Sequence, residues 1–80
     1  MIAHITLDQL REINTSLSKK IEELASKLSY CTRNVEVSYW IDVEMIDNQM
    51  FLFADNGYDI SEEINVPENY REAIYKLVKV

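Results

Sequence analysis

Residues 35–55 read VEVSYWIDVEMIDNQMFLFAD, and they decide the fold that this sequence predicts. Apolar and polar side chains alternate over residues 35–46, which is the period of a half-buried β-strand. Asp47 and Asn48 suit a tight turn, and residues 49–55 return as a second strand. The stretch therefore predicts an antiparallel β-hairpin that directs one face at a core.

The register of this hairpin has two alternatives, which differ in the length of the turn. A two-residue turn at Asp47-Asn48 makes one face wholly apolar, with the pairs Met45–Met50, Val43–Leu52 and Ile41–Ala54. The opposite face then combines aromatic rings with carboxylates, in the pairs Trp40–Asp55, Asp42–Phe53 and Glu44–Phe51. A three-residue turn slips the second strand by one position and places Phe51 and Phe53 in the core. In both registers we expect the carboxylates of the first strand to point outward, because burying them unpaired costs several kcal/mol each: Glu36, Asp42 and Glu44.

The residues before the hairpin predict one long helix. Thr6 and Gln9 fit a capping box, in which each side chain accepts the backbone N–H of the other residue. Apolar residues then recur at helical spacing with no Gly or Pro, so we expect a helix over residues 7–29. Its apolar stripe comprises Leu10, Ile13, Leu17, Ile21, Leu24 and Leu28.

Two further elements are predicted after the hairpin. Asn56-Gly57 is typical of a type I′ turn, because both residues tolerate positive φ, and it predicts a short third strand over residues 58–60. Pro67 suits the first turn of a last helix. The buried stripe of that helix is expected to comprise Tyr70, Ala73, Ile74, Leu77 and Val78.

Together these elements predict a single α+β domain over residues 1–80. The element order is α-β-β-β-α, a three-stranded antiparallel meander with helices packed on one face. A chain of 80 residues, 48% of them apolar, has room for one compact core. The chain shows neither a secretory signal nor an apolar run near the ~20 residues that cross a bilayer, and Cys31 is its single cysteine. We therefore expect a soluble, cytoplasmic protein.

The net charge of −6 is unevenly distributed along the chain. Residues 35–70 contain nine acidic side chains and no Lys or Arg, a net of −9, whereas residues 1–34 carry +1 and residues 71–80 carry +2. A field of this sign repels phosphate backbones and anionic lipid surfaces and speeds the encounter with basic partners. We therefore expect a basic protein partner, without direct binding of nucleic acid and without a membrane.

The sequence contains no clear motif for catalysis or for binding a metal or cofactor. Residues 55–63 gather oxygen ligands around a turn, but they lack the order of an EF-hand loop. His4 is the only histidine, and no pattern of orienting partners accompanies it. A single glycine cannot form a phosphate-binding loop. We expect a protein that is not an enzyme and that has no catalytic residues, no cofactor and no metal site.

In size, charge layout and element order, the chain resembles the small acidic inhibitors that phages use against bacterial nucleases. These include anti-CRISPR and anti-restriction proteins that mimic DNA, and the resemblance covers most of the chain. It implies that carboxylates on a rigid sheet and its turns occupy protein sites that evolved for phosphates. If a phage encodes the chain, the resemblance implies action in the cytoplasm of the host cell.

Two functions follow as hypotheses. The first is a non-enzymatic acidic protein-binding module, an inhibitor that docks an acidic sheet face on a basic, nucleic-acid-binding protein surface; an antitoxin or regulatory subunit would share this contact. Its expected binding residues are Glu36, Trp40, Asp42, Glu44, Phe51, Phe53, Asp55, Asp59, Glu62 and Glu63. The alternative is a structural or regulatory module that homo-oligomerises, for example as a homodimer, because the long N-terminal helix also fits a heptad with one Asn in its seam. The expected contact residues are then Leu10, Asn14, Leu17, Ile21, Leu24 and Leu28.

Overall fold

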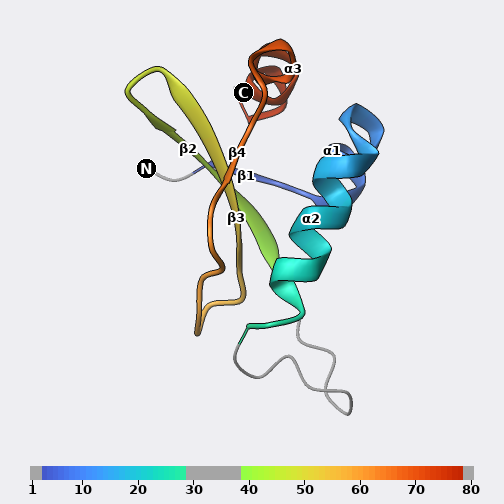
Figure 1. Ribbon diagram of the computed structural model, residues 1–80, viewed down its shortest axis with the longest axis vertical. Helices are drawn as coiled ribbons and strands as arrows, with labels where there is room; N and C mark the ends of the chain where they lie inside the picture. The colour runs from blue at the N-terminus through green and yellow to red at the C-terminus, as the bar shows by residue number, and fades with distance from the viewer. Residues whose placement is uncertain (1–2, 29–38, 79–80) are drawn as a thin grey trace.

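The fold belongs to the α+β class, as a computed structural model that describes residues 3–28 and 39–78 shows (Figure 1). Within these residues the chain forms three helices and a four-stranded antiparallel sheet. In chain order the elements are β1 (Ala3–Ile5), α1 (Leu7–Ile13), α2 (Thr15–Ala25), β2 (Trp40–Ile46), β3 (Gln49–Asp55), β4 (Ile64–Asn65) and α3 (Glu68–Val78). The predicted class is confirmed, but the order β-α-α-β-β-β-α differs from the predicted α-β-β-β-α.

The central hairpin has the register of the two-residue turn. The pairs between β2 and β3 are Met45–Met50, Val43–Leu52 and Ile41–Ala54 on one face, and Trp40–Asp55, Asp42–Phe53 and Glu44–Phe51 on the other. Asp47 and Asn48 have φ values of +50° and +65°, which is typical of a type I′ turn, whose twist matches that of the flanking strands. The alternative with a three-residue turn is therefore wrong. Residues 35–38, the first part of the predicted strand, lie outside the described residues.

The sheet contains a first strand that the sequence pattern did not predict. β1 pairs with β2 through Ala3–Val43, His4–Asp42 and Ile5–Ile41. The strand order is therefore β1-β2-β3-β4, and β2 is an inner strand instead of the edge strand that the predicted meander implies. This change decides the environment of Asp42, the outward side chain of β2 that pairs with β1.

The predicted third strand is displaced along the chain. Residues 58–60 contribute only the isolated bridge Asp55–Ile60, and β4 pairs with β3 farther along, through Leu52–Ile64 and Phe51–Asn65. The three residues 61–63 thus lie opposite only two residues of β3. One extra residue on one of two paired strands is typical of a β-bulge. Asn56-Gly57 does not form the predicted type I′ turn, because Gly57 alone of the two has positive φ.

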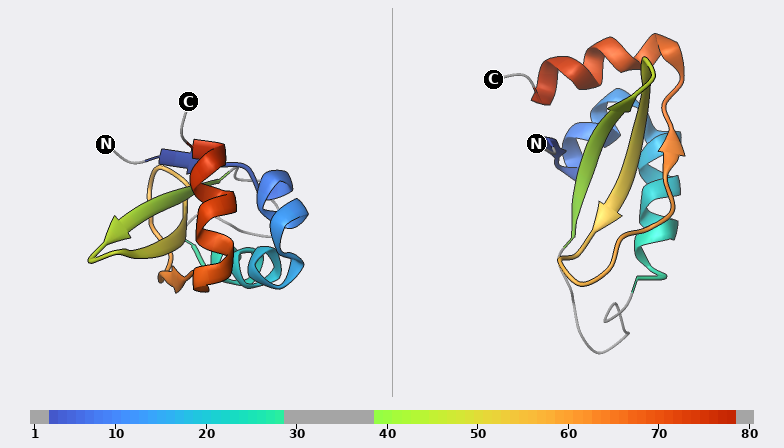
Figure 2. Two further views of the ribbon diagram at one scale, coloured as in Figure 1. Left: turned by 90° about the horizontal axis from the view of Figure 1, so that it is seen from above. Right: turned by 90° about the vertical axis from the view of Figure 1, so that its left-hand side faces the viewer.

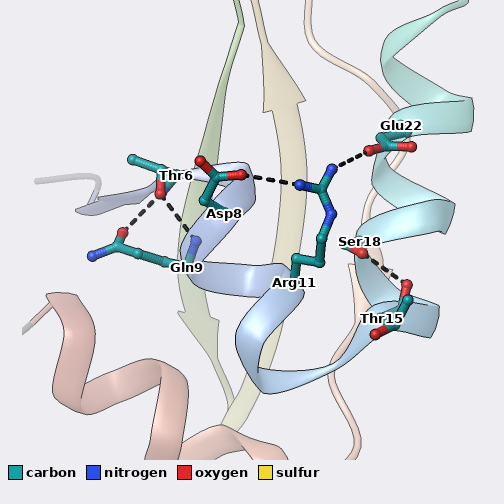
Figure 3. Close-up of polar contacts among 7 residues, drawn as sticks. All are labelled: Thr6, Asp8, Gln9, Arg11, Thr15, Ser18 and Glu22. Carbon is teal, nitrogen blue, oxygen red and sulfur yellow. Dashed lines mark hydrogen bonds and ion pairs between the residues drawn. The ribbon is translucent and has the colours of Figure 1, made fainter.

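The predicted long helix is broken at Asn14. The capping box at its start is confirmed: Gln9 Oε1 accepts the Thr6 N–H at 2.9 Å, and Thr6 Oγ1 accepts the Gln9 N–H at 3.1 Å (Figure 3). Asn14 has extended backbone, ends α1, and accepts the Leu17 N–H at 3.1 Å as the N-cap of α2. An Asn side chain competes with the helical backbone for hydrogen bonds, so it favours a cap over a helix interior.

Arg11 connects the two helices across this break. Its Nη1 lies 3.0 Å from Asp8 Oδ1 in α1, and its Nη2 lies 2.8 Å from Glu22 Oε1 in α2 (Figure 3). All three side chains are exposed, so each pair contributes at most about 1 kcal/mol to stability.

The core lies between the sheet and the helices. α1 and α2 lie on one side of the sheet, and α3 contacts α1 and β1 near the hairpin turn (Figures 1 and 2). The core side chains are Ile5, Leu10, Leu17, Ile21, Ala25, Leu28, Ile41, Val43, Met50, Leu52, Ala54, Val66 and Ile74. Of the predicted stripe of the last helix, Ile74 is buried, whereas Ala73 is exposed.

The heptad seam of the oligomerisation hypothesis is not an exposed stripe. Leu10, Leu17, Ile21 and Leu28 are buried in the core of the chain itself, and Asn14 stands between two helices. The long N-terminal helix on which this hypothesis depended is therefore absent from the described residues. Those residues also contain no helix with the length and apolar character to span a membrane.

Candidate functional site

The side of the sheet that faces away from α1 and α2 forms the candidate site. We call it the open face and define it by its side chains: His4 on β1, Trp40, Asp42 and Glu44 on β2, and Phe51, Phe53 and Asp55 on β3. When the sheet is viewed from this side, α1 and α2 lie behind it (Figure 2, right). Trp40, the only tryptophan of the chain, is 40% exposed here. Exposed aromatic rings of this size are more typical of binding surfaces than of solvated sheet.

Asp42 is buried, which corrects the prediction that it points into solvent. Its side chain is 1% exposed. Because β2 is an inner strand, Asp42 has a neighbour on each side, His4 on β1 and Phe53 on β3, with Trp40 two residues away on the same face. Phe53 is itself buried, whereas Phe51 is half-buried, so the predicted aromatic patch consists mainly of Trp40.

His4 covers the Asp42 carboxylate from solvent. Its Nε2 lies 2.9 Å from Asp42 Oδ1, while the His4 side chain is 53% exposed. Its ring meets the Trp40 indole edge to face, with the centroids 5.7 Å apart. The buried carboxylate therefore lies one side chain below the surface. The sequence showed no partner for His4, and the structure provides one in Asp42. The two side chains form an ion pair when the imidazole is protonated.

The Asp42 carboxylate carries a charge that its surroundings compensate only in part. Burial raises the pKa of Asp42, and the neighbouring Asp55 carboxylate raises it further, from 3.8 to about 6 in total. His4 and the Trp40 indole act in the opposite direction. Neither Asp42 oxygen has a hydrogen bond of good geometry from any described residue, so Asp55 and Trp40 act on the charge from nearby without a well-directed bond.

A shallow recess of about 420 Å³ lies beside this buried charge, at the end of the hairpin remote from its turn. We call it the Trp40 recess, and its walls are formed by Trp40, Asp55, Gly57, Tyr58, Asp59 and Ile60. Tyr58 is 75% exposed and Ile60 is 55% exposed. Sites for small molecules usually enclose most of the ligand, so an open recess is better suited to a side chain that projects from another protein.

The turn that forms one wall of the Trp40 recess is held by its own hydrogen bonds. Asn56 is buried, and its Oδ1 accepts the N–H groups of Tyr58 and Asp59 at 2.9 Å and 2.8 Å. Gly57 has a φ of +86°, and a Cβ at this position would lie 3.5 Å from the Trp40 ring. The turn therefore approaches the indole closely, and the recess is already formed in the free chain.

The remaining predicted binding residues surround the open face. Glu44 and Glu63 line a second shallow recess together with Phe53, Ile60 and Ser61. Asp59, Glu62 and Glu63 are exposed on the segment that leads to β4. Lys27, just after α2, lines a pocket with Asp59 and Glu62, so the negative field is weaker on that side. Glu36 lies outside the described residues.

The Lys and Arg side chains of the described residues are on the helices or just after α2. They are Arg11 on α1, Lys19 and Lys20 on α2, Lys27 just after it, and Arg71 and Lys76 on α3. Arg71 donates to the carbonyl oxygens of Val66 and Asn48, at the hairpin end opposite the Trp40 recess. Among the described residues, His4 is therefore the only basic side chain on the open face.

The site offers a fixed negative charge and an aromatic surface. The His4–Asp42 pair has the form of a base with an orienting carboxylate. However, the Ser and Thr hydroxyls in the described parts of the chain are not hydrogen-bonded to His4. In the same residues, no group of three or more His, Cys, Asp and Glu side chains is placed to hold a metal ion.

Comparisons with protein-family models, with curated proteins and with solved structures found no match for the chain. Function is therefore inferred from the geometry and charge of the open face.

Proposed function

We propose that the chain is a non-enzymatic acidic protein-binding module, an inhibitor that docks its open face on the basic, nucleic-acid-binding surface of another protein. The observation that carries this proposal is the one-sided placement of the basic residues: the described Lys and Arg side chains lie on the helices or just after α2, whereas the open face and the segment beside it carry Trp40 and acidic side chains. Carboxylates held on a rigid sheet can occupy positions where the partner binds phosphates. An anti-CRISPR or anti-restriction protein would act in this way.

Burial divides the contact residues of this proposal into two groups. The residues that present surface to a partner are Trp40, Glu44, Phe51, Asp55, Asp59, Glu62 and Glu63. Asp42 and Phe53 are buried and do not contact a partner directly. Asp42 contributes its charge, and Phe53 supports the sheet face.

Inhibition of purified nucleases tests the proposal. We expect the chain to inhibit DNA cleavage by a member of a panel of restriction endonucleases and RNA-guided nucleases at about 100 mM salt, and to release it at about 500 mM, because the screening length falls from about 10 Å to about 4 Å. The double substitution Glu44→Lys and Glu63→Lys should weaken inhibition about tenfold or more, because like charges would then face each other. Glu12→Lys on the exposed side of α1 is the matched control and should leave inhibition unchanged.

Capture on the immobilised chain complements the panel. We expect the proteins retained from a bacterial lysate at low salt to be basic and to be released at high salt. Retention that is indifferent to salt, retention of acidic proteins, or equal effects of the Glu12 and Glu44 reversals would contradict docking through the open face.

A further inference from the structure

The Trp40 recess has the chemistry of a receptor for one cationic side chain. Building on the docking function above, we propose that the basic partner inserts an arginine guanidinium into the Trp40 recess. The recess combines the exposed rings of Trp40 and Tyr58 with the carboxylates of Asp55 and Asp59. A guanidinium is planar and has five N–H donors, so it stacks on an aromatic face while its edge binds carboxylates. A lysine ammonium matches the charge but not the stacking.

Asp42 distinguishes this recess from an ordinary acidic patch. Its carboxylate is buried, lies 2.9 Å from His4 Nε2 without a hydrogen bond of good geometry from any described residue, and is on the same face as Trp40 and Asp55, both of which line the recess. The two carboxylates are close enough for Asp55 to act on the titration of Asp42. A buried charge is screened less by water, so it attracts a nearby cation more strongly than a solvated one. A cation bound at Asp55 would relieve the repulsion between the two carboxylates.

The described residues supply no cation to the recess. Among the described residues, no Lys or Arg lines it. His4 is on β1 and Asp55 is on β3, so Asp42 has a basic neighbour on one side and an acidic neighbour on the other. Asp55, the acidic neighbour, lines the recess, so the recess can accept a guanidinium from a partner.

Binding of the guanidinium should strengthen as the pH rises from about 5 to about 7. The cation favours the ionised form of Asp42, whose pKa is about 6. The other titratable groups near Asp42 act on the cation through their charge: a protonated His4 on β1 repels it, whereas the carboxylates of Asp55 on β3, Glu44 on β2 and Asp59 in the wall of the recess attract it.

The indole N–H of Trp40 provides a direct reporter, because the chain has one tryptophan and therefore one indole resonance. We would titrate the full chain, labelled with nitrogen-15, with N-acetyl-Gly-Arg-Gly-amide at low salt. The matched probes are the same peptide with lysine or with citrulline, which keeps the shape of arginine without its charge. We expect a saturable shift of the Trp40 indole signal with arginine, a dissociation constant about threefold or more larger with lysine, and no saturable shift with citrulline.

Variants separate the recess from a general effect of charge. Asp55→Asn, Asp42→Asn and Tyr58→Leu should each raise the dissociation constant of the arginine peptide by about threefold or more, whereas Glu12→Gln should leave it unchanged. Asp42→Asn removes the charge at nearly constant size, and its unfolding curve is recorded on the same sample. A folded Asp42→Asn variant that binds arginine less tightly supports a role of the charge in binding.

The outcomes also separate this proposal from the docking function. Equal shifts with arginine and citrulline, no saturable shift with arginine, or unchanged affinity in both Asp42→Asn and Asp55→Asn would overturn the arginine site. If nuclease inhibition nevertheless depends on Glu44 and Glu63, the open face docks by other contacts. If the arginine peptide binds as expected but no basic protein is inhibited or captured, the docking function fails while the site stands.

Discussion

Asp42 shows how one residue can follow the strand pattern and still differ from it in environment. Alternation along β2 places its side chain on the outer face, as the sequence predicts. There, Phe53 on β3 and His4 on β1 enclose it, and the carboxylate loses contact with water. A carboxylate tolerates such a site when it can take up a proton near neutral pH or when a cation approaches it.

Asp42→Asn is predicted to stabilise the fold above about pH 6 and to leave it nearly unchanged near pH 4. The pKa of Asp42 in the folded chain, about 6, lies above the ordinary value of 3.8, so folding takes up a proton between these values. The stabilisation that comes with protonated Asp42 is complete below pH 3.8 and is lost as the pH rises through about 6. A difference of this size corresponds to up to roughly 3 kcal/mol, because one pKa unit is about 1.4 kcal/mol.

Urea unfolding of both proteins between about pH 4 and pH 8 measures this difference. Glu12→Gln serves as the control, because Glu12 is exposed on α1. If the difference in unfolding free energy between Asp42→Asn and the parent chain does not increase with pH, Asp42 is ionised without penalty in the folded chain.

At the scale of elements, the hairpin was predictable up to a choice between two registers, whereas its neighbours were not. Alternation over two strands predicts the hairpin, and the positive φ of Asp47 and Asn48 in a two-residue turn selects one of the two registers. β1 has three residues and β4 has two, which is too short for a period to be visible. The break at Asn14 was missed because the apolar stripes of α1 and α2 face the same core, so the helical spacing continues across the cap.

Asn14→Ala provides a test of this break with an unambiguous sign. In the structure Asn14 caps α2, so its replacement by Ala is predicted to lower the unfolding free energy by about 1–2 kcal/mol. In one continuous helix, the same change would raise it by up to about 0.7 kcal/mol, because Ala has the higher helix propensity. Asn14→Ser retains a cap oxygen and should lose much less than Ala does. Urea unfolding of the three proteins distinguishes the two geometries.

For the molecule as a whole, the sidedness of charge was predictable, but the recess was not. The run of acidic residues without Lys or Arg is visible in the sequence, and strand alternation directs part of it outward. The Trp40 recess instead depends on Asn56, which buries its amide and bends the chain so that Gly57 approaches the indole. Such an arrangement combines residues from β2 and from the turn after β3, so no spacing pattern within one segment of the sequence predicts it.

Concentrating like charge on one side of a small domain should destabilise the free chain, and salt should relieve this repulsion. We predict that raising the salt from about 20 mM to about 200 mM increases the unfolding free energy of the parent chain by about 0.5–1 kcal/mol, because the screening length falls from about 20 Å to about 7 Å. The double variant Glu44→Gln and Glu63→Gln neutralises two carboxylates that line one recess, so it should be more stable at low salt and respond less to added salt.

Glu12→Gln with Glu23→Gln is the control, because these residues lie on the helices that carry the basic side chains. Urea unfolding measures all three without adding ions of its own. An equal response of the two double variants would show that the open face carries no excess repulsion. If the Glu44 and Glu63 variant gains stability as predicted, the same two carboxylates should be those whose loss weakens nuclease inhibition, because a basic partner relieves the repulsion that salt screens.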